Sequence, residues 1–318
     1  MVPALANDIC PELIDLYSDP SRPTSKVKIE LLKLAEVWDF ISESHQTWQE
    51  IAFTLEQSGT SATTATDLIQ KHLTKRMAKL GSEFFNEFSR RLTRDLPTKL
   101  RRVEKIQIER KRELPPDEFA KNVEGSIRAA FYMAVRRRYN ERRIAEVLDD
   151  TRVADFFFLR EYCYASMFRF NSRGEFNVPY GGISYNRKRF QDKIERLYSS
   201  ETAKRLLNTK FYNLDFEDFI HKVKPTQQDF VFVDPPYDSD FTDYDDKEFR
   251  EIDQRRLAKV LSELNSNVML IIGDTELVRN LYPKPKWKIQ EDQMSYKWTI
   301  KDRNERSKVH LTITNYKE

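Results

Sequence analysis

Two hydrophobic patterns divide the chain. From about residue 25 to residue 149, apolar side chains recur every three or four positions, which is the period of an amphipathic helix packed on one face. One such stripe comprises Ile29, Leu32, Leu34, Val37, Trp38 and Ile41. We therefore predict a region that is helical almost throughout, with its stripes buried as core. Pro115 and Pro116 break this region between two helices.

Short apolar runs on either side of the helical region predict strands. One run covers residues 2–6 and precedes a helix that Pro11 opens. Four consecutive β-formers at 230–233 are too few for a helix and typical of a central strand. The other candidate strands are residues 210–213, 268–272, 294–300 and 309–315, with a helix at about 250–264. Alternating strands and helices that finish in a hairpin predict an α/β fold, mostly parallel with an antiparallel edge.

Composition indicates a soluble protein with an ionic surface, because charged residues make up 33% of the chain and hydrophobic residues 39%. No apolar run reaches the roughly 20 residues that span a bilayer, so no membrane segment is expected. Cys10 and Cys163 stand far apart without a C-x-x-C pattern, and the four histidines lack metal-ligand spacing. We expect a protein of the reducing cytoplasm, without a disulfide bond and without a bound metal.

Positive charge is unevenly distributed, although the net charge is only +3. Residues 71–112 contain 14 Lys and Arg against 5 acidic residues. A second basic cluster consists of Arg136, Arg137, Arg138, Arg142 and Arg143. Two interpretations stay open: these are solvated helix faces, or they contact a polyanion, whose neutralised phosphates would add affinity for any sequence.

The motif D-P-P-Y at residues 234–237 is the strongest candidate for chemistry. Asp234 directly follows the run at 230–233, and ligands of open α/β sheets collect beyond the carboxyl ends of the strands. The Asp234 carboxylate and the Pro235 carbonyl could accept both hydrogens of an exocyclic amine and aim its lone pair at an electrophile. Pro235 and Pro236 stiffen the backbone, and Tyr237 would stack on the base. The simpler alternative is a strand-ending turn with an N-cap aspartate.

Together with the segment "FNSRGEFNVPYG", this motif resembles the Dam-type (class alpha) DNA adenine-N6 methyltransferases. The resemblance covers residues 1–17 and about 160–318, with several separated motifs in the order of the family. It implies transfer of a methyl group from S-adenosyl-L-methionine to an adenine flipped out of double-stranded DNA. It also implies a cytoplasmic, nucleoid-associated protein of a prokaryote or a phage.

The resemblance assigns cofactor contacts to two strand ends and to the motif. In "ALANDICPELIDLY", Asp8 would hold the ribose hydroxyls and Ile9 would pack on the adenine of the cofactor. In "FYNLDFEDF", Asp215 would lie near the adenine amine and Phe216 against its ring. Asp234 would face both the cofactor and the substrate.

The resemblance also assigns DNA contacts, mostly before and within the N-V-P-Y-G run. Arg169 would form a bidentate contact with a guanine edge, which its fork geometry suits. Tyr164 and Met167 would wedge or pack near the flipped base, although local core packing of Tyr164, Met167 and Phe168 is the alternative. The remaining residues would shape the loop, touch phosphates, or close over substrate or cofactor: Asn171, Arg173, Pro179, Phe241 and Tyr244.

Two segments with which members of the family normally begin do not occur in this sequence: a K-W-x-G-G-K-like segment and an F-x-G-x-G loop after the first strand. The expected fold is thus a Rossmann-like methyltransferase sheet, incomplete because its first strand is missing, with a large helical insertion. We expect a second polypeptide to supply that strand and the glycine loop, so that the enzyme is active only as a hetero-oligomer. The expected regions are 1–23 (start of the core), 24–150 (basic helical insertion), 151–198 (target recognition) and 199–318 (remainder of the core).

Alternative functions stay open at this point. The chain could be a catalytically inactive DNA-recognition subunit that supports another methyltransferase chain. The same class of motif also serves cytosine amines, glutamine amines and RNA adenine. Restriction-modification, phage defence and regulation are the biological roles that a DNA adenine methyltransferase could serve.

Overall fold

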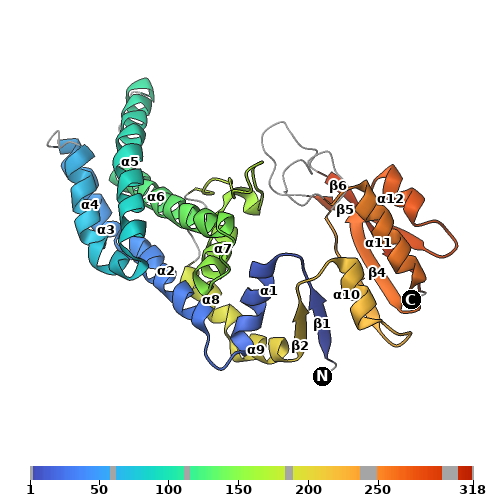
Figure 1. Ribbon diagram of the computed structural model, residues 1–318. Coiled ribbons are helices and arrows are strands. Elements are labelled where there is room, and N and C mark those ends of the chain that lie inside the picture. Colours follow the sequence, from blue (N-terminus) through green and yellow to red (C-terminus); the bar gives the residue numbers. More distant parts are fainter. Residues whose placement is uncertain are drawn as a thin grey trace. The chain divides into compact units, whose positions relative to one another are not determined.

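The computed structural model describes residues 3–57, 62–110, 115–182, 189–236, 249–295 and 307–316 (Figure 1). The chain forms two compact units. We call them the helical unit (Met1–Leu5, Pro11–Arg169 and Gly174–Phe211) and the sheet unit (Ala6–Cys10, Phe170–Arg173 and Tyr212–Glu318). Helices predominate, and the strands form two small sheets, so the protein is a mixed α/β structure.

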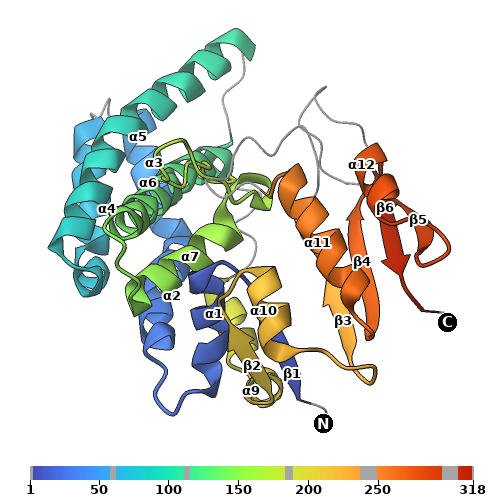
Figure 2. The ribbon, with the colours of Figure 1, turned by 45° about the vertical axis from the view of Figure 1, so that its right-hand side comes forward.

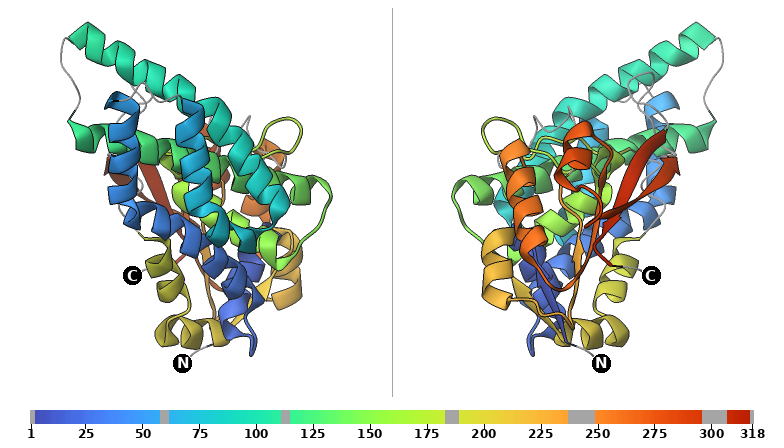
Figure 3. Two further views of the ribbon diagram at one scale, coloured as in Figure 1. Left: turned by 90° about the vertical axis from the view of Figure 1, so that its left-hand side faces the viewer. Right: turned by 90° about the vertical axis from the view of Figure 1, so that its right-hand side faces the viewer.

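The helical unit confirms the long helical region predicted from the 3.6-residue period. Its helices are α1 (Pro11–Ser18), α2 (Lys26–Glu43), α3 (His45–Gln57), α4 (Ala62–Met77), α5 (Ser82–Arg110), α6 (Pro116–Ile144), α7 (Asp150–Tyr162), α8 (Phe190–Leu197) and α9 (Ser200–Leu207). The two longest, α5 and α6, pack against each other and are the teal and green helices of Figure 3. Pro115 caps α6, as the predicted break requires.

The core of the helical unit is aromatic. Trp38 of α2 is fully buried, and its ring centroid lies 4.6 Å from that of Tyr162 and 4.9 Å from that of Phe158. The predicted stripe on α2 is therefore mostly core, although Leu32 is only half-buried. Leu31 is buried, whereas Ile29 lies on the solvent side, because a helix turns by 100° per residue and position 31 faces the same side as positions 34, 38 and 41.

Buried ion pairs tie the helices of this unit together. Glu12 of α1 accepts a hydrogen bond from Arg152 of α7 at 2.7 Å and another from the Tyr139 hydroxyl of α6 at 2.9 Å. Burial alone would raise the pKa of Glu12, but these hydrogen bonds, one from its own backbone and the Arg152 charge together lower it. The carboxylate therefore stays ionised and satisfied between three helices.

The smaller sheet consists of β1 (Ala4–Asn7) and β2 (Thr209–Tyr212). The Ala4 amide donates to the Asn208 carbonyl at 3.0 Å, and the Asp8 amide donates to the Tyr212 carbonyl at 3.2 Å. The bonding partners advance by the same number of residues in both chains, so the strands run parallel. Both strands lie within a residue or two of the predicted positions.

The larger sheet has the strand order β3-β4-β6-β5. Its strands are β3 (Phe230–Val233), β4 (Asn267–Gly273), β5 (Lys288–Ser295) and β6 (Ser307–Thr314). Strand β3 pairs parallel with β4, whereas β6 pairs antiparallel with both β4 and β5. The predicted antiparallel hairpin is present, but the expectation of a mostly parallel sheet is wrong for these four strands, because only one of their pairings is parallel.

The position of β5 is a second correction. The sequence placed this strand at residues 294–300, but it begins at Lys288. As an edge strand paired only through β6, β5 carries charged and polar side chains such as Glu291 and Asp292, so it has no apolar run to reveal it. Residues 296–300 lie outside the described part of the chain.

The core of the sheet unit lies on one face of the larger sheet. Val231 and Val233 of β3 point to that face and pack with Leu257 and Leu261 of α11 (Glu251–Glu263). The short helices α10 (Phe216–Val223) and α12 (Glu276–Leu281) add Ile220 and Val278 to the same cluster. Figure 2 shows α11 running alongside β3 and β4. These helices thus cover one face of β3 and fix the position of its carboxyl end.

The opposite face of β3 is largely uncovered. Phe230 and Phe232 alternate with the two half-buried valines, and 57% and 56% of their surface is exposed. Strand β3 also lies at one edge of the sheet. Parallel strands are normally buried on both faces. Strand β3 thus has the apolar composition of an interior strand, although one of its faces is exposed and it lies at an edge.

Candidate active site

The predicted catalytic motif follows β3 directly, as the sequence indicated. Asp234 is exposed, and its side chain has no hydrogen bond or ion pair with another described residue. Pro235 is buried and Pro236 is exposed. The carboxylate is thus exposed at the tip of a strand whose valines pack against the core on one face. Tyr237, Phe241 and Tyr244 lie outside the described residues.

A buried glutamine of α11, which the sequence analysis missed, anchors this motif. Gln254 is fully buried, and its Nε2 donates to the carbonyl oxygen of Pro236 at 3.1 Å. Its Oε1 has no hydrogen-bond partner among the described residues. A signal was present in the sequence: Gln254 is a polar residue on the apolar stripe that Leu257 and Leu261 continue.

The turns after β1 and β2 are joined side by side. Asn7 and Leu214 exchange two hydrogen bonds, from Asn7 Nδ2 to the Leu214 carbonyl at 2.9 Å and from the Leu214 amide to Asn7 Oδ1 at 3.0 Å. Asn213 Nδ2 donates to the Asp8 carbonyl at 2.8 Å. These bonds bring Asp8 and the turn that leads to Asp215 to the same end of two adjacent parallel strands.

The Asp8 side chain is half-buried, and one of its two carboxylate oxygens accepts a hydrogen bond. Its Oδ1 accepts the Cys10 amide at 2.7 Å, whereas Oδ2 has no partner among the described residues. Ile9 beside it is 53% exposed. Among the described residues, one carboxylate oxygen and the exposed side chain of Ile9 therefore have no bonding partner assigned at this turn.

Asp215 and Phe216 meet a single arginine, which sequence reasoning also missed. Asp215 caps α10 by accepting the Glu217 amide at 2.9 Å, and the same oxygen accepts from Arg256 of α11 at 2.9 Å. The Arg256 guanidinium carbon lies 4.8 Å from the Phe216 ring centroid. Hydrogen bonds to Asp253 and Glu217, with the Asp215 charge, raise the pKa of Arg256. Arg256 therefore fixes a carboxylate and an aromatic ring together.

The segment around the N-V-P-Y-G run folds back on itself. The Tyr164 amide donates to the Pro179 carbonyl at 2.9 Å, and the Asn177 amide donates to the Arg169 carbonyl at 3.3 Å. We call residues 163–169 the reading arm and residues 174–181 the return arm. At the connection, the Arg173 amide donates to Asn171 Oδ1 at 3.0 Å.

The predicted residues of the reading arm divide into two groups. Phe168 stacks on Phe176 of the return arm with ring centroids 4.4 Å apart, so core packing, the simpler alternative, holds for Phe168. Tyr164 is exposed, and Met167 and Arg169 are half-buried. Asn171 is half-buried, and Arg173 and Pro179 are exposed.

The second basic cluster is not a set of free cations, because each of its arginines has a protein partner, although Arg137 is also exposed to solvent. Arg137 bonds Glu87 and Glu141 at 2.6 Å, and Arg138 bonds the buried Asp155 at 2.6 Å. Arg142 bonds Asp149 at 3.1 Å, and Arg136 and Arg143 bond backbone carbonyls.

The first basic cluster is also partly neutralised. Burial alone would raise the pKa of Glu87, but hydrogen bonds from Arg91, Arg90 and Arg137 hold it at about 2. Lys71, Lys75 and Arg102 are exposed and form no ion pair with other described residues. A polyanion would therefore meet individual cations here, because part of the positive charge counted in the sequence is neutralised by ion pairs.

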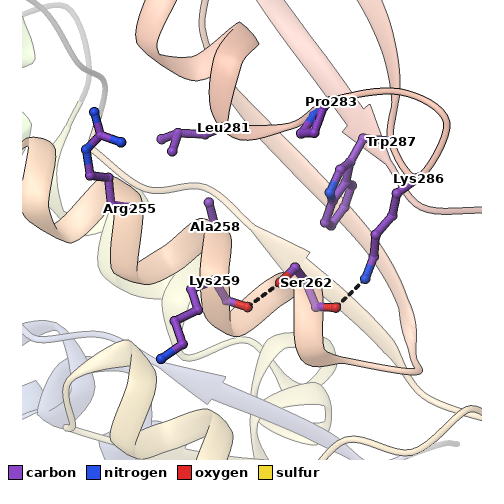
Figure 4. Close-up of a pocket in the computed structure, with 8 residues that line it drawn as sticks. All are labelled: Arg255, Ala258, Lys259, Ser262, Leu281, Pro283, Lys286 and Trp287. Atoms are coloured by element: carbon purple, nitrogen blue, oxygen red, sulfur yellow. Dashed lines mark hydrogen bonds between the residues drawn. The ribbon is translucent and has the colours of Figure 1, made fainter.

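A surface pocket of about 380 Å³ lies between α11 and the segment after α12 (Figure 4). Two of its lining residues are joined by a hydrogen bond from Lys286 Nζ to the Ser262 carbonyl. Its lining residues are Arg255, Ala258, Lys259, Ser262, Leu281, Pro283, Lys286 and Trp287. None of them is a predicted site residue, and we assign this pocket no function.

Within the described ranges, no group of three or more His, Cys, Asp or Glu side chains is arranged to hold a metal ion. Over the same ranges, none of the helices combines the length and the apolar character that crossing a bilayer requires.

Comparison with known proteins identifies the class. Residues 78–296, more than half of the chain, match the family of D12 class N6 adenine-specific DNA methyltransferases, and the chain belongs to this family. S-adenosylmethionine is the methyl donor of the class. Tyr237 and Tyr244, although outside the described structure, lie within the matched range.

Three relatives illustrate how far the similarity extends. The chain is 36% identical over 154 residues to the type II methyltransferase M.MjaIII of Methanocaldococcus jannaschii, covering 47% of this chain and 50% of the relative. It is 31% identical over 164 residues to the type II methyltransferase M.CviBI of Paramecium bursaria Chlorella virus NC1A, covering 51% and 60%. It is 30% identical over 242 residues to the DNA adenine methylase of Salmonella typhi, covering 68% and 79%. The chain thus spans half to three fifths of the length of the first two.

Proposed function

We propose that this chain is the catalytic, DNA-reading subunit of an adenine-N6 methyltransferase that acts on double-stranded DNA. The observation that carries the proposal is the exposed carboxylate of Asp234 at the tip of β3, which bonds no other described residue, in a chain of the D12 family. The buried Pro235 and the anchored Pro236 make that position rigid. A rigid acceptor pair is what an amine of low nucleophilicity requires.

The proposed chemistry begins with an adenine extruded from the duplex. The Asp234 carboxylate and the Pro235 carbonyl each accept one hydrogen of the exocyclic amine, which draws the nitrogen toward tetrahedral geometry and aims its lone pair. When bound, S-adenosylmethionine would supply an electrophilic methyl group, and its sulfonium sulfur would leave as a neutral thioether. Asp234 then accepts the proton that the methylated nitrogen releases and passes it to water. Tyr237 stacks on the base.

The hydrogen-bonded turns after β1 and β2 fit the adenosine part of that cofactor. Asp8 has an oxygen left for the ribose hydroxyls, and Ile9 presents an apolar surface to the adenine ring. Asp215 would accept the adenine amine, with Phe216 against the ring. Both turns lie at the carboxyl ends of adjacent parallel strands, where ligands of α/β sheets bind.

Arg256 provides a test of this cofactor assignment. Replacement of Arg256 by methionine keeps an unbranched side chain over Phe216 but removes the donor to Asp215. Because a charge-assisted hydrogen bond is lost, we expect the KM for S-adenosylmethionine to rise about tenfold, with a smaller change in kcat. Steady-state kinetics at saturating DNA measures both. Arg255→Met is the matched control, since Arg255 bonds Glu251 on the outer side of α11; equal effects of both substitutions would refute the assignment.

The reading arm is the proposed DNA-recognition element. Arg169 would contact a guanine edge, with Tyr164 and Met167 near the flipped base. The other proposed contacts come from Asn171, Arg173, Pro179 and Tyr244. The antiparallel pairing of the two arms supports this proposal, because it gives Arg169 a fixed backbone position.

We further propose that a second polypeptide completes the sheet. The order β3-β4-β6-β5, with the separate parallel pair β1-β2, supports a Rossmann-like methyltransferase sheet in which one strand has its place beside β3. The edge position of β3 and the exposed Phe230 and Phe232 support the same idea. The partner would carry this strand, the glycine-rich cofactor loop and apolar side chains that cover the two phenylalanines. Enzyme activity would then require the hetero-oligomer.

The identity of the modified base tests the proposed function. The chain is co-expressed with a candidate partner that contains F-x-G-x-G but no D-P-P-Y, and the complex is incubated with duplex DNA and labelled S-adenosylmethionine. Mass spectrometry of the digested DNA should show the label in N6-methyladenine. Label in methylcytosine, or in protein or RNA alone, would contradict the proposal.

A further inference from the structure

One face of α6 is directed at the backbone of the return arm. Its four side chains are Tyr132, Arg136, Asn140 and Arg143, whose spacing of four, four and three residues places them on one side of a helix. All four bond to main-chain atoms within residues 174–178. We call this set the α6 clamp.

Asn140 holds the return arm at two points. Its Nδ2 donates to the Phe176 carbonyl at 3.0 Å, and its Oδ1 accepts the Phe176 amide at 2.9 Å. The side-chain amide therefore satisfies both polar backbone groups of one residue, as a neighbouring strand would. Such two-point pairing is specific for register, because a shift by one residue would turn each side chain of an extended segment to the other side.

The other members of the clamp hold the ends of the same stretch. The Tyr132 hydroxyl donates to the Val178 carbonyl at 3.0 Å, and Arg136 donates to the Asn177 and Val178 carbonyls at 3.2 and 3.3 Å. Arg143 donates to the Gly174 carbonyl at 2.9 Å. Tyr132 is fully buried, and its burial raises its pKa, so the hydroxyl remains a donor.

The return arm in turn holds the reading arm. The Asn177 amide bonds the Arg169 carbonyl, and the Phe176 ring stacks on Phe168, the neighbour of Arg169. The clamped residues Phe176 and Asn177 are therefore the ones that contact the reading arm. A change of register at Phe176 would therefore displace Arg169 as well, because the hydrogen bond and the ring stacking connect the two arms.

We propose that the α6 clamp sets the sequence selectivity of DNA methylation by fixing the position of Arg169. This inference rests on the proposed function and gives the helical insertion a role within it. Its members are positioning residues: their polar groups bond the return arm and need no contact with DNA. Arg136 and Arg143, read from the sequence as phosphate contacts or a solvated face, act here on backbone carbonyls.

Two substitutions separate positioning from general stability. Asn140→Asp keeps the acceptor for the Phe176 amide but places a second acceptor against the Phe176 carbonyl. Tyr132→Phe removes only the hydroxyl and leaves Arg136 to serve the Val178 carbonyl. Arg137→Gln is the control, because Arg137 lies on the same helix and bonds Glu87 and Glu141 instead of the return arm.

The measurement is the ratio of methylation rates on the preferred site and on sites with one base pair changed. The assembled enzyme is used, and the preferred site is first mapped by sequencing modified adenines in native DNA. We expect Asn140→Asp to lower this ratio at least tenfold, which corresponds to the loss of one directional contact between Arg169 and a base. We expect Tyr132→Phe to lower the ratio two- to threefold, which corresponds to a partial loss of that contact. Arg137→Gln should leave it unchanged.

If active Asn140→Asp enzyme kept the wild-type ratio of methylation rates, the proposed role of the α6 clamp would be overturned. An equal fall of this ratio in Asn140→Asp and Arg137→Gln would overturn it as well. If Asn140→Asp does not fold, the ratio for Tyr132→Phe decides. A wild-type complex that methylates no adenine would instead refute the proposed function itself, so the two failures are distinguishable.

Discussion

Replacing Asp234 by asparagine should lower the rate of adenine methylation by roughly 10²–10³-fold in the assembled enzyme, the range observed when one preorganised polar contact at a reacting centre is removed. Asparagine has nearly the same shape, but it substitutes a neutral amide for the carboxylate that accepts the amine hydrogen and the released proton. Because Asp234 bonds no other described residue, the fold should be unaffected. DNA binding and cofactor binding should change only a few-fold.

The matched control is Asp229→Asn. Asp229 lies just before the other end of β3, where its Oδ2 accepts the Thr226 amide at 2.7 Å. Its substitution should leave the methylation rate unchanged when measured in single-turnover experiments with equal amounts of folded protein. If Asp234→Asn retained full activity, catalysis would belong to another chain, and the DNA-recognition subunit would become the better account.

Replacing Phe232 by glutamate should weaken association with the strand-carrying partner by about 10²-fold, since burial of a phenylalanine contributes roughly 2–3 kcal/mol and a buried unpaired charge adds a further penalty. Phe232 is more than half exposed, so the stability of the isolated chain should change little. Titration calorimetry of the two chains, with methylation measured at limiting partner, reports the loss.

The control for this prediction is Leu207→Glu on α9, where an apolar side chain is 65% exposed. It should leave partner affinity intact. Equal affinity of the Phe232→Glu and wild-type chains would exclude β3 as the docking edge. A cofactor-binding monomer formed by the wild-type chain alone would argue against the partner altogether.

The features that could be predicted from the sequence are local. Phe230–Val233 and the aspartate after it are consecutive residues, so the strand and the position of its motif follow from the run itself. The helices of residues 26–144 repeat their apolar period over many turns. By contrast, α9 is only eight residues long and buries none of them, and β5 is a polar edge strand without an apolar run, so both were missed or misplaced.

The features that could not be predicted depend on contacts distant in sequence. Arg256 meets Asp215 across 41 residues, and Tyr132 meets Val178 across 46. No periodicity encodes such pairs. The arginines of α6 show the consequence: counting charges indicated phosphate contacts or solvent, whereas the fold commits Arg136 to carbonyls and Arg138 to the buried Asp155. Gln254 is the exception, because a polar residue on an apolar stripe is visible in advance.

The most direct test of the catalytic assignment is a crystal structure of the assembled enzyme with duplex DNA and a non-transferable analogue of S-adenosylmethionine. We predict that the exocyclic nitrogen of one extruded adenine lies within hydrogen-bonding distance, about 3 Å, of both Asp234 Oδ and the Pro235 carbonyl oxygen. An ordered target base held by other residues, with Asp234 still facing solvent, would contradict this account.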